Sequence, residues 1–172
     1  AVMQKLVDEV DENCNLGTLD GHEIVYIDHV ECRWPLRRQM EVGTRLPAYC
    51  TGIGKVLLAH LPEKTLEQYL SVAELKPQTE HSWTDPEAFR EHLAEVRERG
   101  YAIGNQENLI GLLSIAVPVP DPLGRVVAGL SIHGPVTRLP EDRARAFVPM
   151  LQEAAQTISE LMIESASRRL TT

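Results

Sequence analysis

The sequence predicts an α+β domain in which helices flank an antiparallel sheet. Three observations support this class: helical hydrophobic periodicity at both ends of the chain, strand-like segments joined by short turns, and the lack of a repeated strand–helix–strand pattern. Parallel strands need long crossover connections, whereas short turns join antiparallel strands. The pattern therefore favours α+β over a doubly wound α/β fold.

Composition restricts the class of protein further. A chain of 172 residues can form one domain with a substantial core. Its 17 Lys and Arg residues against 25 Asp and Glu residues give a net charge of −8, which argues against a surface for binding nucleic-acid phosphates. Three cysteines are too few for a disulfide framework and favour a reducing, cytoplasmic location. No apolar run approaches the roughly 20 residues of a membrane helix, and we expect no membrane partner.

The first predicted helix covers residues 2–12 and ends within 13–17. Its apolar residues share one helical face: Val2, Met3, Leu6, Val7 and Val10. No capping residue precedes this helix, although helices usually begin with one. We therefore expect the complete protein to continue upstream of residue 1; the alternative is a processed or uncapped start.

A hairpin follows, with Asp20-Gly21 as the turn between 15–19 and 22–32. Residues 33–49 are expected to be irregular. Four arginines lie in this segment: Arg33, Arg37, Arg38 and Arg45. They can pair with a carboxylate or an acidic partner, or they can be solvated side chains of a loop.

Three helices are expected in the middle of the chain. Thr51 is a capping residue for a helix over 52–59, and Pro62 begins a short one. Asp85-Pro86 combines a capping residue with a proline suited to a first helical turn, and Gly100 ends that helix. A short strand is expected at 101–103.

Two strands, 114–120 and 125–134, should be joined by a turn over 121–124. A last long helix begins at Pro140, and Pro149 should kink or delay it. For the hairpin we expect Ser114 opposite Ser131 and Leu112 opposite His133, without the one-residue shift of a bulged loop, because that shift would mix the two faces.

In this register one face is wholly apolar and the other is small and polar. The apolar face carries Leu113, Ile115, Val117, Val119, Val126, Ala128, Leu130 and Ile132. The other face carries Leu112, Ser114, Ala116, Val127, Gly129, Ser131 and His133. Small residues beside hydroxyls and an imidazole are typical of a wall that accepts a small polar ligand. The alternative is a face exposed to water.

A second candidate site is the glycine-rich helix start at 51–54. Glycines permit close approach of a ligand, and free amides with the helix dipole favour an anion; the alternative is ordinary capping and packing. Cys50 precedes this helix, where a thiolate could be stabilised, or it is a buried inert cysteine. His29 and Cys32 lack a second pair at metal-ligand spacing, so we expect no metal. The sequence contains neither GxSxG nor HExxH, and we expect no catalytic residues and no cofactor.

Several segments together resemble the central signature of IclR-type bacterial transcriptional regulators. In order, they are VGTRLP (42–47), CTGIGKVLLA (50–59), RERGYAIG (97–104), Glu107, Gly111, AVPV (116–119), the segment 124–135, and Leu139. Each piece is weak by itself, but the ordered set spans nearly the whole chain and is specific.

The resemblance implies a C-terminal effector-binding domain with a GAF-like antiparallel sheet flanked by helices. Residues 1–14 would be the end of a linker helix from an N-terminal winged helix-turn-helix domain, and 15–172 the effector domain. Such domains bind small metabolites, often organic or aromatic acids, and form dimers or tetramers. DNA would be contacted through the N-terminal domain and not through residues 1–172.

The resemblance also assigns an effector pocket. Gly52 and Ile53 match the backbone amides that hold a ligand carboxylate, and Leu112, Ser114, Ser131 and His133 match pocket positions on two strands. Gly104 stands where some members have an acidic residue, and His133 replaces a small hydroxyl residue. Both departures imply a different and larger acid, aromatic acids included, with His133 as donor or cation.

Two functions remain at this point. The first is ligand sensing without catalysis, in which the effector modulates DNA binding or promoter activity of the full-length protein. The second is a thiol-based redox sensor or a small enzyme on a GAF-like fold that uses Cys50 or His133. The second requires a partner base and a depressed Cys50 pKa.

Overall fold

The computed structural model describes residues 1–36 and 38–170. The elements in chain order are α1 (Val2–Val10), β1 (Asn13–Asp20), β2 (Glu23–Val30), β3 (Arg45–Pro47), a 3-10 turn (Ala48–Cys50), α2 (Gly52–Ala59), α3 (Glu63–Val72), α4 (Pro86–Arg99), β4 (Ala102–Asn105), β5 (Leu112–Pro120), β6 (Val126–Pro135), α5 (Glu141–Ala146) and α6 (Val148–Leu170). Within these residues no helix is long and apolar enough to cross a membrane.

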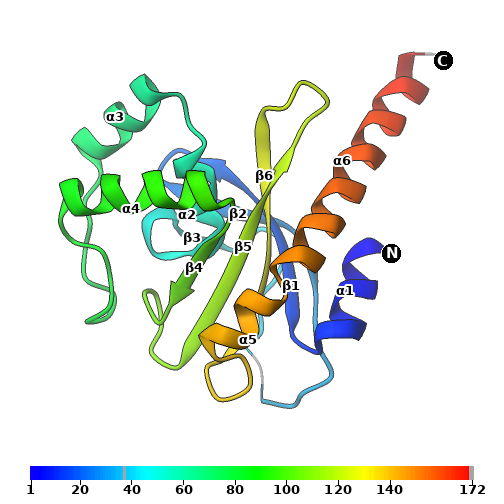
Figure 1. The fold of residues 1–172 in the computed structure, drawn as a ribbon, viewed down its shortest axis with the longest axis horizontal. Helices are drawn as coiled ribbons and strands as arrows, with labels where there is room; N and C mark the ends of the chain where they lie inside the picture. Colours follow the sequence, from blue (N-terminus) through cyan, green and yellow to red (C-terminus); the bar gives the residue numbers. More distant parts are fainter. Residues whose placement is uncertain (37, 171–172) are drawn as a thin grey trace.

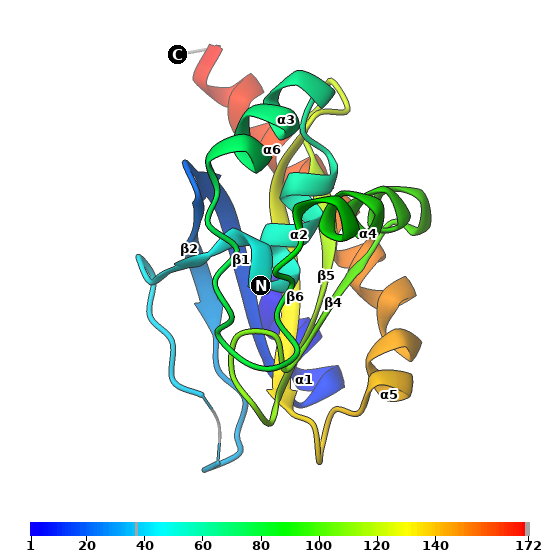
Figure 2. The same cartoon turned by 90° about the vertical axis from the view of Figure 1, so that its left-hand side faces the viewer.

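Six strands of the described chain form one antiparallel sheet in the order β3-β2-β1-β6-β5-β4. Helices cover both faces of this sheet: α1, α5 and α6 lie on one side, and α2 and α4 lie on the other (Figures 1 and 2). The predicted α+β class, an antiparallel sheet flanked by helices, is confirmed.

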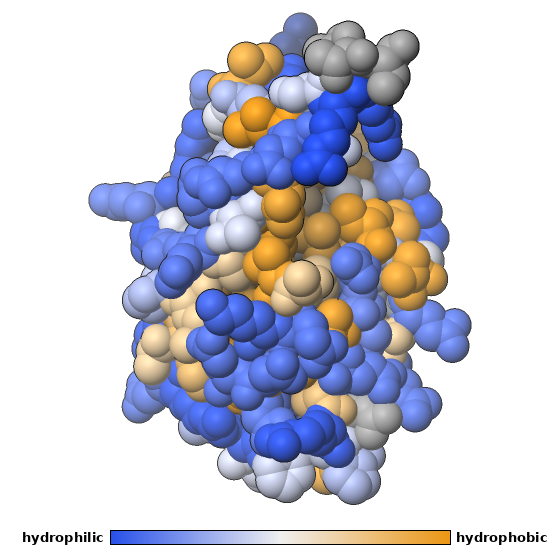
Figure 3. Space-filling view, turned by 90° about the vertical axis from the view of Figure 1, so that its right-hand side faces the viewer, coloured by the Kyte–Doolittle hydropathy of each residue, from blue (hydrophilic) through white to orange (hydrophobic). Residues whose placement is uncertain are grey.

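The sheet separates two hydrophobic cores. One joins α1 and α6 to the apolar face of β5 and β6, with Val10, Ile115 and Leu151 fully buried. The other joins α2 and α4 to the opposite face, with Ile24, Leu58 and Phe89 fully buried. On the side that carries α1 and α6, apolar surface remains exposed between hydrophilic side chains (Figure 3).

Most predicted boundaries follow from the capping residues. The Thr51 side chain accepts from the Gly54 amide, and the Asp85 side chain accepts from the Ala88 amide, so α2 and α4 begin where expected. Gly21 at φ 62° forms the first hairpin turn. The last helix is interrupted at Phe147, two residues before Pro149. α1 ends at Val10, two residues earlier than expected, and β1 begins at Asn13.

The segment 33–49 is not wholly irregular, contrary to the expectation from its sequence. Arg45–Pro47 forms β3, which pairs with the edge of β2, and 48–50 form the 3-10 turn. The Arg45 guanidinium lies 2.5 Å from Oδ2 of Asp20 and 3.1 Å from Oε1 of Glu23. These ion pairs connect β3 to the β1–β2 hairpin. Three residues are too short a strand to show alternation.

The expected register of the β5–β6 hairpin is wrong. Ser114 lies opposite His133, Leu112 opposite Pro135, and Ala116 opposite Ser131. Two one-residue shifts cause the difference. The first shift lies in the turn itself. The Gly124 amide donates to the Asp121 carbonyl, Gly124 has a φ of 79°, and Asp121 pairs with Arg125 instead of with Gly124.

A second irregularity lies between Val119 and Pro120, opposite Val126 and Ala128. The two shifts add to an even number, so the polar and apolar faces are preserved from 112 to 119. Val126, beyond the second shift, packs with the α2 core and not on the apolar face where the expected register places it.

Candidate ligand-binding site

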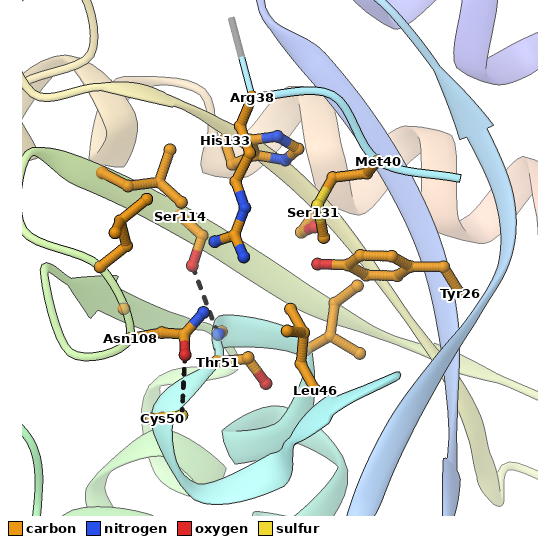
Figure 4. A pocket seen from close by; sticks show the side chains of 15 residues that line it. Tyr26, Arg38, Met40, Leu46, Cys50, Thr51, Asn108, Ser114, Ser131 and His133 are labelled. Atoms are coloured by element: carbon orange, nitrogen blue, oxygen red, sulfur yellow. Dashed lines mark hydrogen bonds between the residues drawn. The ribbon is translucent and has the colours of Figure 1, made fainter. Parts of the chain in front are cut away.

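A pocket lies between the concave face of the sheet and the N-terminus of α2 (Figure 4). Its lining residues are Tyr26, Arg38, Met40, Leu46, Cys50, Thr51, Gly52, Ile53, Gly104, Asn108, Leu109, Leu112, Ser114, Ser131 and His133. All seven predicted effector-binding residues are among them: Gly52, Ile53, Gly104, Leu112, Ser114, Ser131 and His133. The pocket has a volume of about 440 Å³ when its open mouth is included. The centre of a water molecule can occupy only about 30 Å³ of it, so the pocket is narrow.

The first turn of α2 supplies one end of the pocket. The Gly52 amide donates to Oγ of Ser114 at 3.3 Å, and the Ile53 amide belongs to the first turn, where amides lack intrahelical partners. These amides and the helix dipole favour an anion at this end. Glycine is needed here because a Cβ on Gly52 would lie 2.9 Å from Oγ of Ser114.

Arg38 is the cation of the pocket, and the sequence alone does not single it out as a site residue. Its guanidinium extends into the centre of the space, close to Ser114 (Figure 4). Within 1–36 and 38–170 no carboxylate forms an ion pair with it, and none of the described lining residues is acidic. The main chain is held by Asn13, whose Nδ2 donates to the Arg38 carbonyl at 2.9 Å.

Two other arginines of the segment 33–49 form ion pairs with carboxylates of the chain. Arg33 pairs with Asp11 at 3.4 Å on the surface, and Arg45 pairs within the sheet as described above. Arg37 lies outside the described residues. Pairing with carboxylates of the chain itself therefore accounts for Arg33 and Arg45, whereas Arg38 is directed at the pocket.

Two buried hydroxyls face the same space. Tyr26 is 6% exposed and Ser131 is 2% exposed, and among the described residues neither hydroxyl has a hydrogen-bond partner. Burial raises the pKa of Tyr26 to about 12, so it is a neutral phenol. Both hydroxyls can therefore form hydrogen bonds with a polar group in the pocket. Tyr26 and Asn108 were not predicted, although Tyr26 lies on the same alternating face of β2 as Ile24.

His133 is buried and contacts two asparagines. Burial first, then the positive charges of His29 and Arg38, lower the pKa of His133 to about 3. The imidazole is therefore neutral near pH 7. This argues against the cationic role expected from the family resemblance, and it leaves Arg38 as the charged anchor.

Cys50 does not have the properties of a reactive thiol. Burial raises the pKa of Cys50 to about 12, the opposite of the depressed pKa that the redox or enzyme alternative needs. Its Sγ lies 3.6 Å from both the Pro47 carbonyl and Oδ1 of Asn108. In the part of the chain that the structure describes, no cluster of three His, Cys, Asp or Glu side chains could hold a metal ion.

Replacing Gly104 with alanine is expected to block the end of the pocket beside the N-terminus of α2. The new Cβ would lie 2.7 Å from Oγ of Ser114 and 3.2 Å from the Gly52 amide. We expect affinity for a ligand held beside the N-terminus of α2 to fall by about tenfold or more, with a stability loss of about 1–3 kcal/mol from crowding. Calorimetric titration and urea unfolding measure the two effects. Unchanged ligand affinity would show that the ligand is not held at this end of the pocket.

The fold and the pocket define a small-ligand-binding α+β domain. The family model described as "Bacterial transcriptional regulator IclR C-terminal" matches residues 1–160. The chain belongs to this family, and it corresponds to the C-terminal domain that the family model describes.

Relatives agree with this assignment. The chain is 39% identical over 164 residues to the probable transcriptional regulator SauR of Cupriavidus necator, covering 95% of this chain and 65% of SauR. It is 43% identical over 160 residues to the HTH-type transcriptional regulator KdgR of Escherichia coli, covering 93% of this chain and 61% of KdgR. The chain thus spans less than two thirds of the length of these relatives.

Solved structures match as well. The crystal structure of the C-terminal domain of E. coli KdgR superposes with a TM-score of 0.84 at 42% identity, covering 94% of this chain and 93% of that one. The inducer-binding domain of a PobR double mutant from Acinetobacter, in complex with 3-hydroxybenzoic acid, has a TM-score of 0.84 at 28% identity, covering 93% of this chain and 94% of that one.

Proposed function

We propose that this chain binds a small organic acid, with the ligand carboxylate between Arg38 and the N-terminus of α2. The observation that carries the proposal is the guanidinium of Arg38, which has no carboxylate partner in the described chain and shares its space with the N-terminus of α2. An arginine beside a helix N-terminus is a strong carboxylate site, because charge-assisted hydrogen bonds add to the helix dipole.

The effector acts as a signal and is not transformed. No described lining residue combines a nucleophile with a depressed pKa, and the pocket offers hydrogen-bond donors suited to recognition. The complex of the related PobR domain with 3-hydroxybenzoic acid supports an acid as ligand. The narrow space favours small acids.

In the full-length protein, effector occupancy would modulate DNA binding or promoter activity. Residues 1–14 would continue from a separate N-terminal DNA-binding domain, and the effector domain would assemble as a dimer or tetramer. The net charge of −8 supports DNA contact outside these residues. The ligand can shift regulation only by its differential affinity for two states of the assembly.

A thermal-shift screen of organic acids, followed by Arg38→Ala, tests the proposal. An acid at 100-fold excess over its Kd should stabilise the chain by about 2.7 kcal/mol. Removing the guanidinium should lower acid affinity about 10–100-fold, since a hydrogen bond to a charged group contributes about 1.5–3 kcal/mol.

Arg33→Ala is the matched control, because this arginine lies in the same segment but on the surface. It should bind the acid as the wild type does. Equal affinity of Arg38→Ala and wild type, or the lack of any stabilising acid, would contradict the proposed function.

A further inference from the structure

A buried ion pair lies beside the segment that carries Arg38. Glu12, two residues after the end of α1, is 1% exposed, and Nε and Nη2 of Arg138 each donate to one of its carboxylate oxygens at 2.9 Å. Arg138 belongs to the turn that follows β6. Because both oxygens are held by one planar guanidinium, the two side chains have a fixed mutual orientation.

Contacts outside the pair restrict both partners further. A Cβ on Gly134 would lie 2.4 Å from Oε2 of Glu12, so the carboxylate lies directly against the main chain of β6. The carbonyl of Arg138 accepts from Nη1 of Arg143 at 2.5 Å. The direction of the remaining nitrogen of Arg138, Nη1, follows from the planar fork.

This remaining nitrogen contacts the segment that carries Arg38. Nη1 of Arg138 donates to the Leu36 carbonyl at 2.7 Å. The Trp34 ring lies 5.2 Å from Cζ of the same guanidinium, within the range of a cation–π contact. One arginine thus connects the buried Glu12 carboxylate to the main chain two residues before Arg38.

Asn13, the neighbour of Glu12, holds the same segment at two other points. Its Oδ1 accepts from the Cys32 amide at 2.7 Å, and its Nδ2 donates to the Arg38 carbonyl at 2.9 Å. Residues 31–36 and 38–40 belong to no helix or strand, so no regular main-chain ladder holds them. Side chains of two consecutive residues therefore fix this segment, directly through Asn13 and through Arg138 for Glu12.

We propose that the Glu12–Arg138 pair is a positioning element for Arg38: by holding the main chain at Leu36, it keeps the Arg38 guanidinium beside the N-terminus of α2. The inference rests on the proposed function, in which Arg38 binds the carboxylate of an acid. No carboxylate of the described chain pairs with Arg38, so its place in the pocket depends on the main chain from which it extends (Figure 4). A binding group that is already in place costs less to order when a ligand arrives.

Arg138→Lys tests this role. Lysine keeps a positive charge for the buried Glu12 carboxylate, but its single ammonium cannot replace two bonds to Glu12 and one to Leu36. The probe is the acid that binds the wild type most tightly in the thermal-shift screen. By calorimetry we expect acid affinity to fall by about fivefold or more, although Arg138 does not line the pocket.

Arg90→Lys is the matched control. Nε and Nη2 of Arg90 donate to the two carboxylate oxygens of Glu67 at 2.7 Å, and its Nη1 bonds Glu87. Arg90 lies in α4 and does not line the pocket, so this variant should bind the acid as the wild type does. A smaller loss than expected in Arg138→Lys, or an equal loss in both variants, would overturn the proposal.

A double-mutant cycle separates positioning of Arg38 from a general effect on the fold. In the Arg38→Ala background, Arg138→Lys should lower acid affinity no further, because the guanidinium that it positions is gone. An equal loss in both backgrounds would contradict a role through Arg38.

Tryptic cleavage tests the same pair without any ligand. The sequence offers cleavage sites after Arg33, Arg37 and Arg38, and cleavage of a folded chain reports local opening. We expect faster cleavage at these sites in Arg138→Lys than in the wild type or Arg90→Lys, and an unchanged rate would overturn the proposal. Failure of every acid to bind the wild type would instead contradict the proposed function, while the cleavage rates still decide whether the pair holds this segment.

Discussion

Lys55→Met is expected to lower the free energy of unfolding by about 3–5 kcal/mol, since removing one partner of a buried ion pair leaves the other charge uncompensated. Lys55, in α2, is fully buried, and its Nζ lies 2.8 Å from Oε2 of Glu107. It also donates to the Ile103 carbonyl, while Nε2 of His92 lies 3.1 Å away. The second carboxylate oxygen of Glu107 has no partner among the described residues.

The loss should depend on pH in a defined direction. Burial raises the pKa of Glu107, and Lys55 opposes that shift. Without the lysine the folded-state pKa should rise further above the unfolded value. The remaining stability is then fully present below the unfolded pKa and is lost as pH rises through the folded pKa. Lys55→Met should therefore be more destabilised at pH 8 than at pH 5.

Urea unfolding at both pH values checks this expectation. Arg145→Met is the matched control, because its pair with Glu141 is exposed and should contribute less than about 1 kcal/mol. The double variant Lys55→Met, Glu107→Leu should recover much of the loss. A single variant within about 1 kcal/mol of wild type would contradict the structural role of the pair.

Gly54→Ala should also destabilise strongly, although helix propensity alone predicts a gain of about 1 kcal/mol in α2. A Cβ on Gly54 would lie 2.0 Å from the carbonyl oxygen of Ala48, which is main chain and cannot rotate away. The 3-10 turn and the first turn of α2 must separate. We expect a loss of about 3 kcal/mol or more, together with loss of acid binding at the displaced amides.

Thermal and urea unfolding measure the effect. Gly124→Ala is the control: it has open space around its Cβ but a φ of 79°, so it should lose only about 1–2 kcal/mol. A Gly54→Ala chain as stable as wild type would mean that the turn and α2 can move apart at little cost.

Local sequence chemistry predicts the helices and strands of this fold well. It does not predict the β5–β6 register, because two small effects combine there. Thr51 and Asp85 begin their helices because a side-chain oxygen satisfies a free amide, which is visible in the sequence. The β5–β6 register depends on two separate one-residue shifts, and only the glycine at 124 indicates one of them. The faces are preserved only because the shifts add to an even number.

The site shows the same limit. Residues on regular strands, such as Ser114 and Ser131, are predicted by alternation together with the family resemblance. Arg38 lies in a segment without periodicity, and its carbonyl accepts from the side-chain amide of Asn13, which is distant in sequence. No local pattern distinguishes it from Arg33, which lies earlier in the same segment and on the surface.

β1 serves both layers of the domain. The side chains of Asn13 and Asn15 contact His133, which lines the pocket, whereas Cys14 and Leu16 pack in the core that contains α1. Successive side chains of a strand point to opposite faces, so the odd-numbered and even-numbered side chains share one backbone. β1 therefore links the packing under α1 to the pocket on the far side of the sheet.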